Sequence, residues 1–82
     1  MPYFEFLWTD ETVEHIAEHD ISTEEFEEIV RHPVSRSRSR SSGLPAAFGY
    51  TSDGRYVIAI YEPLDETTII PVTAFEVDEP AS

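Results

Sequence analysis

All the helical periodicity of this sequence lies between residues 10 and 32, and this constrains the fold more than any other feature. The segments on either side, residues 3–8 and 46–75, alternate in hydrophobicity or are apolar throughout, as strands are. Separate blocks of helices and strands favour an α+β fold with a helix pair covering one sheet face. A chain of 82 residues is expected to form one domain, residues 1–77, followed by a short tail, residues 78–82.

Two short helices are expected within this block. Their bounds are Thr9 or Asp10 to about His19 for the first, and Ser22 to about His32 for the second. Their apolar stripes are Val13, Ile16 and Ala17 in the first, and Phe26, Ile29 and Val30 in the second. Ser22 and Glu25 have the spacing of a capping box, and Pro33 ends the second helix. Because the link between the helices is so short, they are expected to form an antiparallel hairpin.

The expected sheet is antiparallel and has about four to five strands. Its segments are residues 3–8, 46–51, 55–61 and 67–75, with a hairpin turn at 52–54. In the first segment, Phe4, Phe6 and Trp8 share one face, which is expected to enter the core. In the last segment, Ile70, Val72 and Ala74 share a face. Pro71 cannot donate a ladder hydrogen bond, so this strand is expected at an edge or with a bulge there.

The segment VSRSRSRSSG, residues 34–43, contains three of the chain's five arginines, although the net charge is −12. If residues 34–41 are extended, Arg36, Arg38 and Arg40 lie on one face. We call these three residues the arginine row. A serine-rich segment can equally be a mobile loop, so both interpretations stay open. Because guanidinium groups match phosphate and carboxylate geometry, the row predicts contact with an anionic partner.

Composition excludes several classes of site. The sequence has no cysteine, so it has neither a disulfide framework nor a thiolate metal site. No apolar run approaches the roughly 18 residues of a membrane span. The N-terminal residues turn acidic where a secretion signal would continue its apolar core. We therefore expect a cytoplasmic protein that uses no membrane, metal or other cofactor.

Two blocks of the sequence resemble the BrnT-like toxins of bacterial type II toxin–antitoxin systems. They are FLWTDETVEHIAEHDISTEEFEEIVRHP and FGYTSDGRYVIAIYEPLDETTIIPVTAFEV, within about residues 4–77. The resemblance implies the RelE-like fold of the RelE/ParE superfamily, with an N-terminal strand, a two-helix hairpin and an antiparallel sheet. It also implies RNA as substrate and a cognate antitoxin as partner. The family's glycine after the first helix is Asp20 here, and its closing arginine is Phe75.

An RNA substrate would make some polar residues candidates for catalysis. Metal-free cleavage needs a base, an acid and positive charge near the phosphate. His15 and His19 are the candidate base and acid, while Arg55 and the arginine row are the candidate cations. Tyr50 is a candidate for stacking a base. The histidines could equally be surface residues of their helix, and no third metal ligand has a suitable spacing.

The alternative is a binding module without catalysis. Residues 1–30 contain ten acids and no Arg or Lys, so the charge is strongly segregated along the chain. The arginine row would then dock onto an acidic partner protein, or onto the acidic helices of a second copy to form a homodimer.

Overall fold

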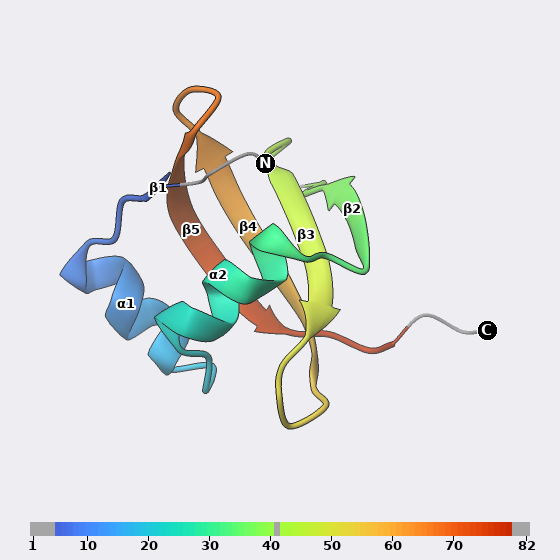
Figure 1. The fold of residues 1–82 in the computed structure, drawn as a ribbon. Coiled ribbons are helices and arrows are strands. Elements are labelled where there is room, and N and C mark those ends of the chain that lie inside the picture. The colour runs from blue at the N-terminus through green and yellow to red at the C-terminus, as the bar shows by residue number, and fades with distance from the viewer. Residues whose placement is uncertain (1–4, 41, 80–82) are drawn as a thin grey trace.

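The computed structural model describes residues 5–40 and 42–79 as a five-stranded sheet with two helices on one face (Figure 1). The elements are β1 (Glu5–Phe6), α1 (Asp10–Ala17), α2 (Thr23–Arg31), β2 (Ser35–Arg38), β3 (Pro45–Tyr50), β4 (Tyr56–Pro63) and β5 (Thr68–Glu76). The α+β expectation is confirmed. The strand order is β1-β5-β4-β3-β2.

The sheet is mixed, which corrects the expectation of a fully antiparallel one. β2, β3, β4 and β5 pair antiparallel, whereas β1 lies parallel to β5. Strands joined by short turns must run antiparallel. The connection between β1 and β5 contains all the other elements, so it is long enough for these two strands to pair in parallel. In the segment expected at 3–8, the strand covers only residues 5 and 6, and residues 3 and 4 lie outside the described part of the chain.

α2 forms as its local signals predict. Ser22 is the N-cap, and both hydrogen bonds of the capping box with Glu25 are present. The expected stripe is buried: Phe26, Ile29 and Val30. Small residues on β3 let the helix approach the sheet closely, since a Cβ atom at Gly49 would lie 3.3 Å from Ile29. α2 therefore covers β3 and β4.

α1 differs from the expectation in length and in burial. It ends at Ala17, and of its expected stripe only Ile16 is buried, because Val13 is 36% exposed and Ala17 is also exposed. α1 packs against β5 near the margin of the sheet, so only a narrow strip of it enters the core. The chain leaves the helix through Asp20, which has a φ of 59°, and re-enters the core at Ile21.

β5 contains a bulge, as its proline predicts. Pro71 and Thr73 pair with consecutive residues of β4, so Val72 is the extra residue. The buried residues of β5 are Ile69, Pro71 and Ala74. The expectation that Ile70, Val72 and Ala74 share a face is therefore wrong, because the bulge at Val72 shifts the alternation by one residue and only Ala74 is buried.

The core lies between the helices and the sheet. Phe26 is fully buried in it and makes edge-to-face contacts with Phe6 and Trp8, at centroid distances of 6.4 and 5.1 Å. The indole of Trp8 donates a hydrogen bond of 2.8 Å to Glu27 on α2. These aromatic contacts tie the N-terminal segment to α2, as expected for Phe6 and Trp8, whereas Phe4 lies outside the described residues. No helix in the described ranges is long and apolar enough to cross a membrane.

Candidate functional site

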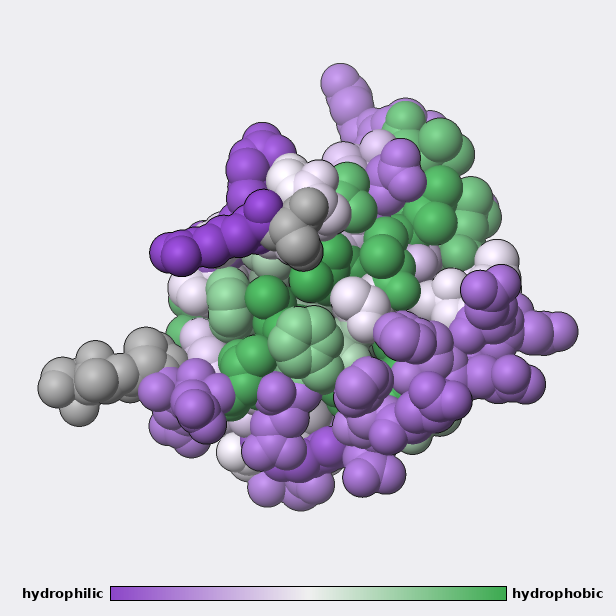
Figure 2. Space-filling model, turned by 180° about the vertical axis from the view of Figure 1, so that it is seen from behind, coloured by the Kyte–Doolittle hydropathy of each residue, from purple (hydrophilic) through white to green (hydrophobic). Residues whose placement is uncertain are grey.

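The sheet face opposite the helices is uncovered by any described helix and is apolar at its centre (Figure 2). Ala47, Ala59 and Ala74 point into the helix-covered core, so their strand neighbours point the other way. The side chains on the uncovered side include Phe48, Tyr50, Tyr56, Ile58 and Phe75. We call these five residues the open face. Aromatic surfaces of this kind suit the stacking of nucleic-acid bases.

The open face is organised by cross-strand contacts. Phe48, Ile58 and Phe75 form one row across β3, β4 and β5. The ring of Tyr56 stacks on Phe48 at 5.7 Å and contacts Tyr50 at 5.0 Å. Tyr50 is 45% exposed, and its ring is therefore available to a ligand. Burial and then the charge and hydrogen bond of Glu79 raise the pKa of the Tyr50 hydroxyl, so the ring stays neutral near pH 7.

The arginine row lies at the β2 margin of the sheet. All four residues of β2 are exposed, and the strand interpretation of this segment is confirmed over residues 35–38. Arg36 and Arg38 share one side of the strand. Arg36 pairs with Ala47, whose side chain enters the helix-covered core, so these two arginines project from the helix side of the sheet, whereas Arg40 lies beyond the end of the strand. Arg38 donates a hydrogen bond of 3.1 Å to the Gly43 carbonyl.

Charge at this margin is not neutralised within the described part of the chain. Neither Arg36, Arg38 nor Arg40 forms an ion pair with a described residue. Strongly hydrophilic side chains stand out at this margin beside the apolar centre (Figure 2). The row is therefore free to meet an external anion.

The two candidate catalytic histidines lie together at the opposite margin. His15 is exposed on α1, His19 is exposed in the turn that follows it, and their ring centroids are 5.5 Å apart. The Nε2 atom of His15 is 2.8 Å from the hydroxyl oxygen of Thr73 on β5. His19 contacts the ring of Phe75, 6.1 Å away between centroids. α1 thus places both imidazoles beside one end of the open face.

Arg55 is occupied by internal partners. Its guanidinium lies 3.1 Å from the Asp53 carboxylate and 3.5 Å from that of Glu25 at the start of α2. Thr51 donates its hydroxyl to Asp53 and accepts a hydrogen bond from the Arg55 N–H. The hydrogen bonds from Thr51 and then Arg55 lower the pKa of Asp53. This cluster fastens the β3–β4 hairpin to α2 and leaves Arg55 little capacity to bind a phosphate.

The Asp53 cluster predicts a specific acid sensitivity. Because the folded protein lowers the pKa of Asp53 below 3.8, its contribution to stability is present above that pH and lost as the pH falls below it. An Asp53→Asn variant should therefore be less stable than the parent at neutral pH, and the difference should shrink in acid. Urea unfolding at about pH 7 and pH 3 measures this. Glu66→Gln, in the exposed β4–β5 turn, is the control, and a pH-independent difference at Asp53 would contradict the prediction.

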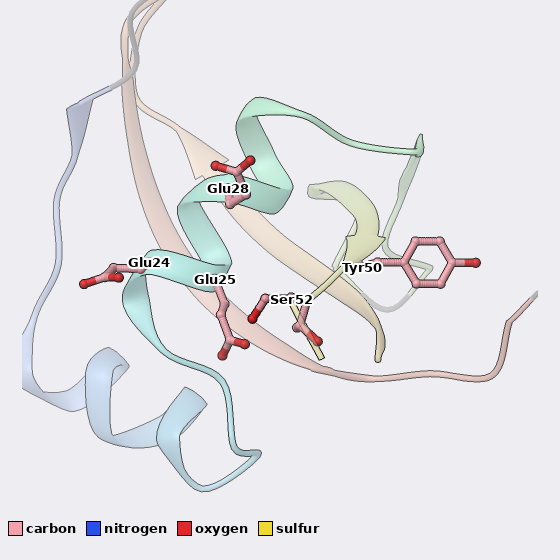
Figure 3. Close-up of a pocket in the computed structure, with 6 residues that line it drawn as sticks. Glu24, Glu25, Glu28, Tyr50 and Ser52 are labelled. Carbon is pink, nitrogen blue, oxygen red and sulfur yellow. The ribbon is translucent and has the colours of Figure 1, made fainter. Parts of the chain in front are cut away.

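A shallow pocket of about 260 Å³ lies between α2 and the β3–β4 hairpin (Figure 3). Its lining residues are Glu24, Glu25, Glu28, Tyr50, Thr51 and Ser52. Figure 3 shows the Tyr50 ring directed away from the glutamates. Across the described residues, no three His, Asp or Glu side chains are arranged to hold a metal ion. Three glutamates give the pocket an acidic lining, and it shares only Tyr50 with the open face.

The fold brings some of the expected site residues together and separates others. His15 and His19 are adjacent, but the arginine row stands at the other margin, with β4 and β3 between β5 and β2. Of the residues expected to line one groove, the histidines lie beside the β5 end of the open face, whereas Arg36 and Arg38 project from the helix side of the sheet at the β2 margin. Sequence reasoning missed Thr73 and Phe75, because only the packing of α1 against β5 makes them neighbours of the histidines, and it missed Phe48, whose partner Tyr56 lies on the next strand.

No family model, curated protein or solved structure matches this chain.

Proposed function

We propose that this chain is a BrnT-like toxin-family protein with a RelE-like fold, which binds single-stranded RNA across the open face and cleaves it without a metal. One observation carries the proposal: the aromatic open face, of which Tyr50 is 45% exposed, lies between the β2 margin, whose arginines form no ion pair with a described residue, and a histidine pair at the β5 margin. Bases stack on Tyr50 and Phe75, and the arginine row contacts phosphates.

The chemistry follows from the histidine pair. One imidazole takes the proton of a ribose 2′-hydroxyl, whose oxygen attacks the adjacent phosphorus. The other imidazole protonates the 5′-oxygen as the phosphorus–oxygen bond breaks. The Thr73 hydroxyl orients the His15 ring through their 2.8 Å contact. The products are a cyclic phosphate and a free 5′-hydroxyl.

The arginine row has a positioning role in this proposal. Three strand spacings separate β2 from β5, which is roughly 14 Å. A guanidinium at β2 therefore holds a neighbouring phosphate, not the one being cleaved. Arg55 takes no part, because Asp53 and Glu25 occupy it on the helix side.

Two features of the fold support the family assignment. The order of elements is a strand, two helices and then four strands, as the resemblance implies. Asp20 has a left-handed backbone, with a φ of 59°, at the position where the family has glycine. Glycine adopts this conformation without strain, and aspartate is among the few other residues that tolerate it.

Salt dependence of RNA binding tests the proposal. Each phosphate contact to single-stranded RNA lowers the slope of log K against log salt by about 0.7, so three arginines predict a slope of about −2. Affinity should then fall about 20-fold between roughly 50 and 200 mM salt. The probe is a short 2′-O-methyl RNA, which binds but cannot be cleaved, and the measurement is fluorescence anisotropy.

The triple variant Arg36→Gln/Arg38→Gln/Arg40→Gln should bring this slope close to zero. Arg31→Gln is the control, since Arg31 already pairs with Glu27 at 3.5 Å. A slope unchanged by the triple variant would refute the role of the row. Absence of RNA binding by the parent protein would favour the second candidate function.

The second candidate is a non-catalytic module that docks an acidic protein surface through the arginine row. The observation in its favour is electrostatic: the net charge is −12, and no arginine of the row forms an ion pair with a described acid of the helices. A field of this sign repels RNA at long range, whereas the row offers local complementarity to carboxylates.

A further inference from the structure

The outer edge of β2 has no partner strand among the described residues. β2 is the last strand of the sheet, and no described residue pairs with its outer side. The Ser39 N–H bonds to the Leu44 carbonyl across the hairpin, at 2.8 Å, so the backbone at Ser39 faces inward. Backbone groups of an antiparallel strand alternate between its two sides. The N–H and C=O groups of Arg36 and Arg38 therefore point outward.

We propose that this edge binds an extended acidic segment of a partner protein, which adds to the sheet as a sixth strand beside β2. The outward backbone groups of Arg36 and Arg38 supply two donors and two acceptors for such a strand. Carboxylates of the added strand lie beside the two guanidinium groups as cross-strand ion pairs. The inference extends the second candidate function and does not depend on RNA cleavage.

The positive charge of the arginine row favours an acidic strand at this edge over other strands that could pair there. A second copy pairing through its own β2 would bring arginines against arginines, which is unfavourable in a cross-strand pair. A neutral strand would gain backbone hydrogen bonds but leave the charge of the row unbalanced. Exposed charged edges normally discourage pairing. Here the positive charge makes pairing with another positively charged edge unfavourable and pairing with an acidic strand favourable.

The test uses synthetic peptides with the intact chain. The probe is a short peptide that alternates glutamate with valine. Its first control has lysine in place of glutamate. The second control keeps the acidic sequence but carries N-methyl groups on the backbone edge that would pair, so that it retains the charge and loses the hydrogen bonds. Fluorescence anisotropy measures affinity, and amide hydrogen exchange by NMR locates the bound segment.

Strand addition predicts that only the unmethylated acidic peptide binds, with slower exchange at the amides of Arg36 and Arg38. An Arg36→Gln/Arg38→Gln variant should lose about 2- to 30-fold in affinity, as expected for two cross-strand ion pairs, whereas Arg31→Gln should lose nothing.

Three outcomes would overturn the inference. Equal binding of the methylated peptide would show charge attraction without strand addition. No binding of any peptide would show a closed edge. Protection of the same amides on raising the protein concentration without peptide would identify a second copy as the occupant. None of these outcomes bears on RNA cleavage by the histidine pair, which is measured separately.

Discussion

Replacing Phe26 with alanine should lower the free energy of unfolding by about 3–5 kcal/mol, the usual loss for a buried phenylalanine. Phe26 is fully buried and contacts both Phe6 and Trp8 edge to face, so its removal leaves a cavity at the centre of the aromatic cluster. A chain of this size has a total stability of roughly 4–12 kcal/mol. The variant should therefore be close to unfolding at room temperature.

Urea denaturation followed by far-UV circular dichroism measures this loss, and the fluorescence of the single tryptophan, Trp8, gives a second probe beside the cavity. Leu64→Ala is the control, because Leu64 is 60% exposed in the turn after β4 and should change stability by less than about 0.5 kcal/mol. A loss below about 1 kcal/mol at Phe26 would mean that the core between the helices and the sheet is not packed as described.

Removing either imidazole of the histidine pair should slow RNA cleavage by about 10²–10⁴-fold, the usual contribution of one general acid or base. His15→Gln on α1 and His19→Gln in the turn after it both keep an exposed polar side chain, so the fold should persist. Neither variant should weaken binding of the 2′-O-methyl RNA, since phosphate contact belongs to the arginine row. The measurement is single-turnover cleavage of an unmodified oligoribonucleotide.

His32→Gln is the matched control for these variants. His32 is the third histidine of the chain and lies at the C-terminal end of α2, in a different element from the pair. Cleavage by the parent should have a bell-shaped pH dependence, and each active variant should lose one limb of it. If His15→Gln and His19→Gln both cleave RNA as fast as the parent protein, the two histidines are surface residues without a catalytic role and the catalytic proposal fails.

Sequence reasoning succeeded where the decisive signals are local. The capping box at Ser22 and Glu25 and the stripe of α2 depend on residues within one or two turns, and both are present. The bulge at Pro71 follows from the missing N–H of proline. The side-by-side histidines follow from their i,i+4 spacing on a helix.

The misses all depend on contacts between distant segments. Val13 is not buried as the apolar stripe of α1 predicts, because the helix packs along the margin of β5. The position of α1 is set by the sheet and not by the residues of the helix. The ion pair of Arg55 with Glu25 joins residues thirty positions apart. The Thr73 contact of His15 spans 58 positions. No spacing rule applied to one sequence reveals such pairs.

Because β1 pairs in parallel with β5, the sheet can be completed only late in the synthesis of this protein. Glu5 and Phe6 pair with Thr68 and Ile69, so β1 has no strand partner until residues 68 and 69 have left the ribosome. At roughly 5–20 residues per second, that interval lasts several seconds. During this interval Phe6 is not yet paired beside β5, and it stays accessible to a chaperone or to any partner that binds the nascent chain.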